Sequence, residues 1–180
     1  SMEAALLLAA LADRAGDNVH LVLFDRAVRG RVTGARGTTL LPAMVDAMAP
    51  IEPTLIDTDW DAALAQAASF TTRPSLVVLL TALDVAGASR GLLGALPTLT
   101  RRTRVVVGSV TDANLPRLAA TRTTSDEVWL AAAVERTLLD ASRLSSAIGR
   151  LGADAISAGP EDLPPRIADR YLELKAAGRL

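Results

Sequence analysis

The chain contains no cysteine among its 180 residues, which excludes disulfides, thiolate metal sites and cysteine nucleophiles together. Aromatic residues make up only 3% of it. The core must therefore be built from Leu, Val, Ile and Ala, which pack but carry no chemistry. The one histidine, His20, lies in an apolar run, where a packing role is the ordinary interpretation and a Ser-His-Asp triad has little to draw on.

The chain also lacks a large excess of positive or negative charge, and it lacks long apolar runs. The formal net charge is -1, and a balanced chain has no general attraction for phosphate backbones, so we expect no nucleic-acid partner. The longest apolar runs, residues 4–12 and 76–80, are far shorter than the roughly 18 to 20 residues that span a bilayer. We therefore expect no membrane contact by this segment.

What the chain does have is enough apolar sequence for one core. Hydrophobic residues make up 50% of it and charged residues 22%. A chain of this length and composition fits a single domain over residues 1–180.

Strand and helix patterns alternate along the sequence. Thr58, with Asp61 three residues on, predicts a helix N-cap, and Thr124 with Glu127 predicts a capping box before a long helix. This alternation predicts an α/β fold with a doubly wound, mostly parallel sheet. The expected helices are residues 4–15, 40–48, 58–70, about 88–96, a long one after Thr124 with Val128, Ala131, Val134, Leu138 and Leu144 near one face, and one from Pro165 to Gly178; the expected strands are residues 19–24, 28–32, 75–80, 104–108 and 154–157.

Polar side chains follow several of these strands, at the edge where open parallel sheets bind ligands. Hydroxyls and carboxylates in such a place suit a hard cation such as magnesium. The same residue types also cap helices and make turns, and this structural role is the interpretation that we favour. The residues after the strands are Asp25 and Arg26, then Thr81, Ala82, Leu83 and Asp84, then Ser109, Thr111 and Asp112. Thr58 and Asp59, at an expected helix start, would face the same edge.

Two other motifs fail on single residues. Asp57, Asp59 and Asp61 match the start of a calcium loop, but Ala62 and Ala68 stand where its glycine and its final carboxylate belong. A glycine-containing loop over residues 30–37 lacks the Lys-Ser or Lys-Thr of a phosphate loop, so a hairpin or surface loop is the better interpretation.

Several stretches together resemble one known family. The chain closes with the run ADRYLELKAAGRL; Pro74 to Leu80 and the stretch Gly16-Asp17 with Val19, Leu21, Phe24 and Asp25 are similar to two of the family's strand signatures. In their order and spacing they resemble family fifty-eight of the domains of unknown function, whose members carry a von Willebrand factor A-like domain.

The resemblance implies a von Willebrand A-like fold, whose metal site normally begins with an Asp-x-Ser-x-Ser motif after the first strand. We expect this chain to be the C-terminal part of a longer protein and to start after that motif. The first strand of the fold would then be absent from this chain. Ala82 also stands where the family has an aspartate after Thr81. The remaining rim of this degenerate site would be Thr58, Asp59, Thr81 and Asp84. Magnesium would bind only with the missing motif present, so we expect no cofactor.

The resemblance also implies a function. Members of the family are commonly encoded beside MoxR-type AAA+ ATPases. We therefore expect a non-enzymatic protein-interaction domain that acts with such an ATPase in protein assembly or maturation, with Asp25, Arg26 and Asp112 as candidates for the interaction surface. It would be a cytoplasmic segment of a membrane-anchored parent. The alternative is a small-molecule enzyme that uses the same crevice, with the carboxylates of Asp25, Asp84 and Asp112 as first suspects.

Loss of a central strand has a consequence for assembly. Residues 19–24 and 75–80 would each keep an apolar edge with unpaired backbone groups, and such edges recruit another strand. We expect the two segments either to pair directly or to be completed by a second copy in a homodimer, and we favour the homodimer.

Overall fold

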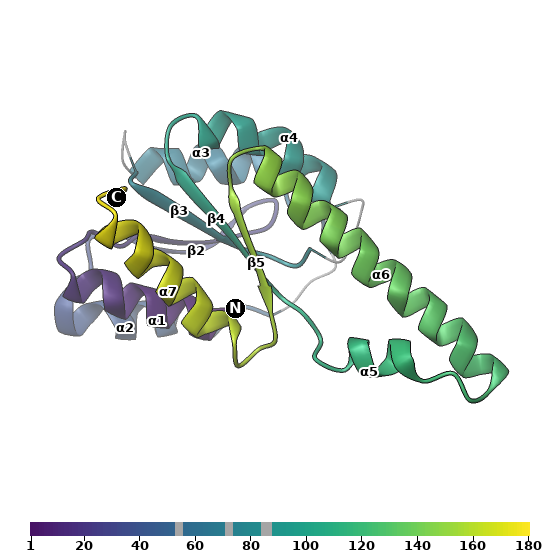
Figure 1. Ribbon diagram of the computed structural model, residues 1–180. Coiled ribbons are helices and arrows are strands. Elements are labelled where there is room, and N and C mark those ends of the chain that lie inside the picture. Colours follow the sequence, from purple (N-terminus) through teal and green to yellow (C-terminus); the bar gives the residue numbers. More distant parts are fainter. Residues whose placement is uncertain (53–55, 71–73, 84–87) are drawn as a thin grey trace.

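The computed structural model describes residues 1–52, 56–70, 74–83 and 88–180 (Figure 1). Helices and strands alternate along most of this length, as the sequence predicts. In chain order they are α1 (Met2–Arg14), β1 (Leu21–Phe24), β2 (Val28–Val32), a 3-10 turn (Gly37–Thr39), α2 (Leu40–Met48), α3 (Trp60–Phe70), β3 (Leu76–Leu80), α4 (Ala88–Thr100), β4 (Arg104–Val110), α5 (Leu115–Ala120), α6 (Ser125–Arg150), β5 (Asp154–Ala158) and α7 (Leu163–Ala176).

Strands β3, β4 and β5 form a parallel sheet in that order, with helices on both faces (Figure 1). α4 and α6 pack on one face, where Leu96 and Ile148 are fully buried. α7 packs on the other face through Ile167 and Leu174. The expected α/β class, with a parallel sheet wound on both sides, is confirmed.

The middle strand β4 holds these layers together. Its residues Val105, Val106 and Val107 are at most 2% exposed. Successive side chains of a strand point to opposite faces, so Val106 packs with α7 while Val105 and Val107 pack with α4 and α6. At Gly108 an added Cβ would lie 2.8 Å from Leu80 Cδ2 and 2.9 Å from Ile167 Cδ1. The glycine therefore allows α7 to approach the sheet closely.

β1 and β2 form a separate antiparallel hairpin across a turn at residues 25–27. Helices α1 and α2 cover it, with Val32 and Met44 in the shared core. Beside β1, the His20 ring stacks on Phe70 of α3 with centroids 5.2 Å apart. His20 thus makes the packing contact that its apolar surroundings predict.

Within the described residues the two sheets are not hydrogen-bonded to each other. Direct pairing of residues 19–24 with residues 75–80 is therefore wrong, because in the described part of the chain β1 pairs only with β2 and β3 only with β4. Completion by a second copy stays a prediction. The arrangement is consistent with a von Willebrand A-like α/β fold that lacks one strand.

The hairpin unit is held to the parallel sheet by the packing of α1 on α7. Just after α1, the carboxylate of Asp17 accepts a hydrogen bond of 2.6 Å from the Tyr171 hydroxyl and one of 2.7 Å from Lys175 Nζ. A polar contact thus joins residues 154 positions apart in the chain.

Two of the predicted helix ends are confirmed in detail. α1 ends at Arg14 with Ala15 as its C-cap, and the next residue is Gly16, whose φ of +81° is the left-handed conformation that glycine adopts without strain. α6 begins directly after Thr124, whose hydroxyl accepts the Glu127 N–H while the Glu127 carboxylate accepts the Thr124 N–H.

Other boundaries differ from the sequence prediction. The N-cap of α3 is Asp59 and not Thr58, because Asp59 Oδ1 accepts the Ala62 N–H at 3.0 Å. α7 starts at the buried Leu163 rather than at Pro165, since its first turn accepts proline without losing a hydrogen bond. α4 runs on to Thr100, and the six-residue α5 was not predicted.

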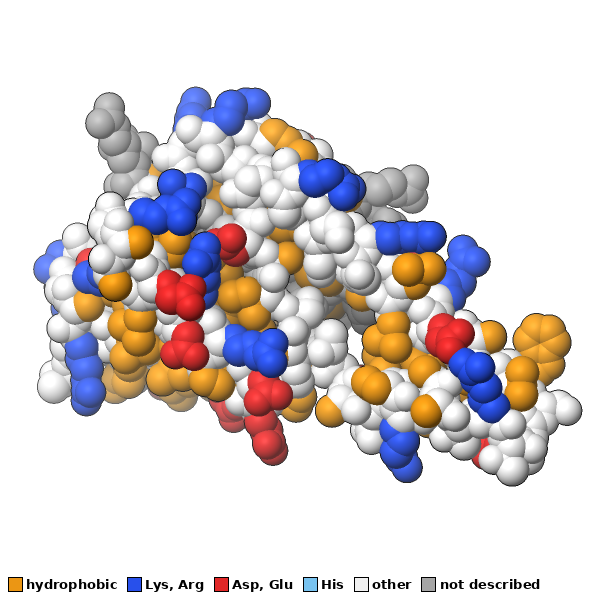
Figure 2. Space-filling model, viewed as in Figure 1, with side chains coloured by type: hydrophobic (Ala, Val, Ile, Leu, Met, Phe, Trp, Pro, Cys, Tyr) orange, Lys and Arg blue, Asp and Glu red, His pale blue; other side chains and the backbone are white. Residues whose placement is uncertain are grey.

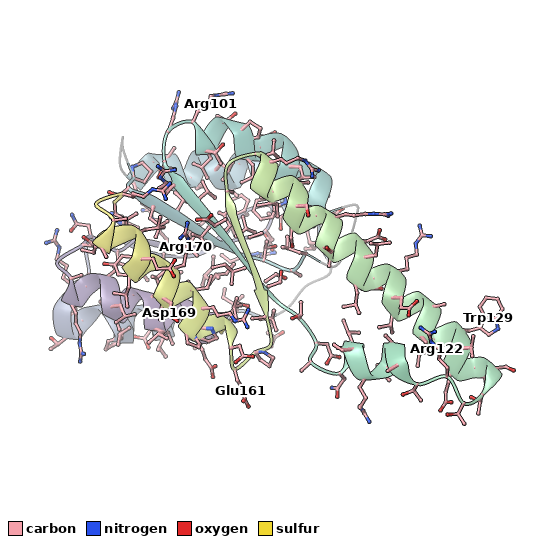
Figure 3. All side chains as sticks on the ribbon, viewed as in Figure 1. Arg101, Arg122, Trp129, Glu161, Asp169 and Arg170 are labelled. Carbon is pink, nitrogen blue, oxygen red and sulfur yellow. The ribbon has the colours of Figure 1, made fainter. Side chains whose placement is uncertain are left out.

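α5 and residues 125–143 of α6, which precede Leu144 of the parallel-sheet core, project from the body as an arm (Figure 1). Val128 was expected on the buried face of α6, but it is 48% exposed because only α5 packs along this part of the helix. Trp129 is 77% exposed and points outward at the end of the arm (Figure 3). Apolar side chains gather on the arm's surface (Figure 2). Among the described residues, no helix combines the length and the apolarity needed to cross a membrane.

Candidate functional site

A shallow hollow lies at the carboxyl end of β1, lined by Arg26, Asp57, Thr58 and Asp59. The Asp59 N–H donates to the Asp25 carbonyl at 2.9 Å, which fixes the start of α3 beside the end of β1. The structure therefore brings together four residues that the sequence singled out, Asp25, Arg26, Thr58 and Asp59. Asp57 also lines the hollow. In the sequence, Asp57 stood out only as part of the calcium-loop motif, which we rejected.

The carboxylate of Asp25 is occupied by its own turn. It accepts the N–H groups of Arg26 and Ala27, the latter at 3.0 Å, and the Arg29 Nε–H at 2.7 Å. The hydrogen bond from Ala27, followed by that from Arg29, holds the pKa of Asp25 below its ordinary value. An ionised carboxylate with these partners closes the hairpin turn and has no proton to donate.

Asp59 is likewise engaged, because one of its carboxylate oxygens caps α3 through the Ala62 N–H. Arg26 and Asp57, in contrast, are exposed on the hollow, where they present one charge of each sign. The hollow can thus bind a charged surface, while its carboxylates mostly serve local turns and caps.

The other predicted residues do not line this hollow. The Thr81 N–H donates to the Gly108 carbonyl at 3.0 Å and continues the pairing of β3 with β4. Asp112 accepts the Asn114 N–H at 2.8 Å in the turn before α5. Ser109, only 3% exposed, accepts the Leu83 N–H. Asp84 lies outside the described residues.

The described residues do not fit a magnesium ion. Residues 1–52, 56–70, 74–83 and 88–180 contain no group of three or more histidine or carboxylate side chains placed to hold a metal. In the hollow, Asp59 has given one oxygen to the helix cap, and the cationic Arg26 shares the lining. A guanidinium beside the remaining oxygens opposes a divalent cation.

Comparison with known proteins gives one match. The family model described as "Protein of unknown function DUF58" matches residues 1–140. This range contains the hairpin unit, strands β3 and β4, the hollow and most of the arm. No curated protein and no solved structure gives a significant match.

Proposed function

Because the chain belongs to the DUF58 family, we propose that it is a non-enzymatic protein-interaction domain that acts with a MoxR-type AAA+ ATPase in assembling or maturing other proteins. The observation that carries the proposal is the state of the polar side chains at the carboxyl ends of the strands. Asp25, Asp59 and Asp112 are engaged in turns and caps, whereas Arg26 and Asp57 present exposed charges. Such a surface suits recognition of another protein by charge more than it suits proton transfer.

The interaction surface in this proposal is the hollow with its exposed pair, Arg26 and Asp57. Exposed interfacial charges mainly set specificity and association rate, and salt screens them. We therefore expect binding to the ATPase to weaken as ionic strength rises.

The direct test measures binding of the purified chain to the MoxR-type ATPase of the same organism by biolayer interferometry. Arg26→Glu should weaken binding about tenfold, because it replaces an attraction by a repulsion. Arg101→Glu is the matched control: Arg101 is also exposed but lies beyond the opposite end of the sheet (Figure 3). Absence of binding, or equal losses in both variants, would overturn the proposal.

The rival function, a small-molecule enzyme in the crevice, has its own test. A broad hydrolase and transferase screen should show no turnover. Activity that disappears in Asp25→Ala, Asp84→Ala or Asp112→Ala would establish the enzyme instead. Calorimetry should likewise show no stoichiometric magnesium site, and a site that Thr58→Ala abolishes would contradict this.

We also propose that the chain is the cytoplasmic segment of a membrane-anchored parent protein. Fractionation of native cells should recover the parent with the membranes, and protease should digest this segment only from the cytoplasmic side. Recovery of the parent in the cytosolic fraction would contradict the proposal.

A further inference from the structure

One face of α6 carries apolar side chains that neither α5 nor the sheet covers. Val128 is 48% exposed and Leu139 50% exposed, and Ala132 between them is exposed too. Their spacing of four and then seven residues puts all three on one face of the helix. The side chains that α6 does bury, Ala131, Val134, Leu144 and Ile148, lie on its other faces.

Charged side chains flank these apolar ones. A shallow hollow on this face is lined by Ala132, Glu135, Arg136, Leu139 and Arg143. Together with Val128 we call these residues the outer stripe. The outer stripe is symmetric about the midpoint between Glu135 and Arg136: Ala132 lies as far before that point as Leu139 lies after it, and Val128 as far before it as Arg143 lies after it.

We propose that the outer stripe binds the outer stripe of a second copy of this chain, with the two α6 helices antiparallel about a twofold axis through that midpoint. In an isologous contact, where residue i of one copy meets residue j of the other, residue j of the first copy also meets residue i of the second. Leu139 then packs over the small Ala132 of the second copy, and Glu135 faces Arg136. Both contacts occur twice, so size and charge are complementary along the whole stripe.

The ends of the stripe are also matched. Val128 lies against the methylene groups of Arg143 of the second copy. Such methylene groups pack well on apolar surface while the charged end of the side chain stays in water. The guanidinium of the same Arg143 comes close to the indole of Trp129, and arginine stacks favourably on a tryptophan ring. This contact would cover the most exposed large apolar side chain of the described residues.

Existing contacts do not oppose the pairing. Glu135 is bound to Arg122, and Arg136 lies 3.8 Å from Asp140. All four side chains are at least 43% exposed, and exposed ion pairs contribute little, so they can exchange partners.

The dimer should be weak. The stripe extends over residues 128–143, about 24 Å of helix. One helix pair of this length buries less than the roughly 800 Å² per partner of a standard interface. We expect a dissociation constant on the order of 10 to 100 µM.

Charge exchange tests the pairing sharply. Sedimentation velocity from 1 to 500 µM should show the unmodified chain passing from monomer to dimer. Glu135→Arg places arginine opposite arginine, and Arg136→Glu places glutamate opposite glutamate, so each variant alone should stay monomeric. An equimolar mixture of the two variants restores both opposite-charge pairs and should form a heterodimer.

Ala133→Arg is the matched control, because Ala133 is exposed on α6 but lies outside the stripe; it should dimerise like the unmodified chain. Far-ultraviolet circular dichroism checks that all variants are folded.

Cross-linking gives a second test, because the chain has no cysteine of its own. A short bismaleimide should join the Ala132→Cys variant to the Leu139→Cys variant in a mixture of the two. It should join neither variant to itself. A chain that is monomeric at 500 µM, a dimer that survives either charge variant, or a mixture that stays monomeric would overturn the proposal.

Discussion

Tyr171 joins α7 to the end of α1 through one hydrogen bond between side chains distant in sequence. The residue is 3% exposed, and its hydroxyl donates to Asp17 at 2.6 Å. Tyr171→Phe removes the donor and keeps the packing. Hydrogen bonds to charged groups contribute about 1.5 to 3 kcal/mol; because Asp17 is partly exposed, we expect a loss near the lower end, about 1 to 2 kcal/mol in urea unfolding. An unchanged unfolding midpoint would show that the contact is not formed in solution.

Asp17 also makes stability depend on pH. Burial alone would raise its pKa, but the hydrogen bonds from Lys175 and Tyr171 outweigh burial and lower it. A carboxylate whose pKa is lower in the folded state than in the unfolded chain stabilises the fold above the unfolded value, and this contribution is lost as pH falls through the folded value. Stability should therefore decline below about pH 4.

In Asp17→Asn, the part of this acid decline that belongs to Asp17 disappears. Thermal unfolding from pH 2 to pH 7 should show a lower melting temperature at pH 7 and a flatter slope below pH 4 than in the unmodified chain. Backbone hydrogen bonds also lower the pKa values of Asp25 and Glu127. These two carboxylates should therefore still make the melting temperature of the variant fall at acid pH. Parallel curves for the variant and the unmodified chain would contradict the assignment.

Gly108 is needed where β4 meets α7. A Cβ there would overlap Leu80 and Ile167, and overpacking a filled core costs about 1 to 3 kcal/mol. Gly108→Ala should therefore lower the free energy of unfolding by that amount. Gly94→Ala is the matched control, because nothing lies within 4 Å of an added Cβ there and alanine favours the helix by up to about 1 kcal/mol. Equal effects of the two substitutions would exclude the close contact.

At the scale of single elements, the sequence predicts best where a local signal decides. Thr124 and Glu127 fix the start of α6, because the side chain of each accepts a hydrogen bond from the backbone N–H of the other. The two residues are three positions apart, so the motif can be recognised in a short stretch of sequence. Helix α5 could not be foreseen, because six residues carry too little periodicity and it is stabilised by packing on α6. The exposure of Val128 was missed for a related reason: periodicity shows that a helix has an apolar face, but not whether another element covers it.

The arm part of α6 and its core-packed C-terminal end should respond differently to the same substitution. Leu144 is 9% exposed against the core, whereas Leu139 is 50% exposed on the arm. Leu144→Ala leaves a cavity and should cost about 2 to 4 kcal/mol in unfolding free energy. Leu139→Ala, measured in dilute solution where the chain is monomeric, should cost less than about 1 kcal/mol. A large effect of Leu139→Ala would mean that the arm folds back on the body.

At the scale of the whole molecule, alternation of strands and helices was enough to predict the layers around β3, β4 and β5. The site residues Asp25 and Arg26 could be located because the apolar run of β1 ends just before them. Thr58 and Asp59 could be located because they lie at the expected start of α3. The sequence could not show that these residues separate from Thr81 and Asp112. That separation follows from the split between the hairpin and the parallel sheet, and pairing between distant strands leaves no local pattern.

The last prediction concerns the open edge of β3. In a parallel pair, the backbone groups of alternate residues point to the same neighbour. The Ser75 carbonyl and the Thr81 N–H both bond to β4, so the N–H groups of Val77 and Leu79 point to β4. Those of Val78 and Leu80 point to the other edge, which no strand of the described residues covers. Amide hydrogen exchange followed by NMR should therefore find Val77 and Leu79 strongly protected, and Val78 and Leu80 exchanging at least about a hundredfold faster.

The same measurement decides whether a second copy completes the sheet, as the sequence first suggested. β1 and β3 have four and five residues, a short platform for pairing, and the outer stripe of α6 offers copies a longer, self-complementary contact. We therefore expect Val78 and Leu80 to exchange rapidly even at concentrations where the chain dimerises. Slowing of these two amides with rising concentration, retained in Glu135→Arg, would instead place the dimer at the strand edges. Slow exchange at every concentration would mean that the edge is covered within one chain.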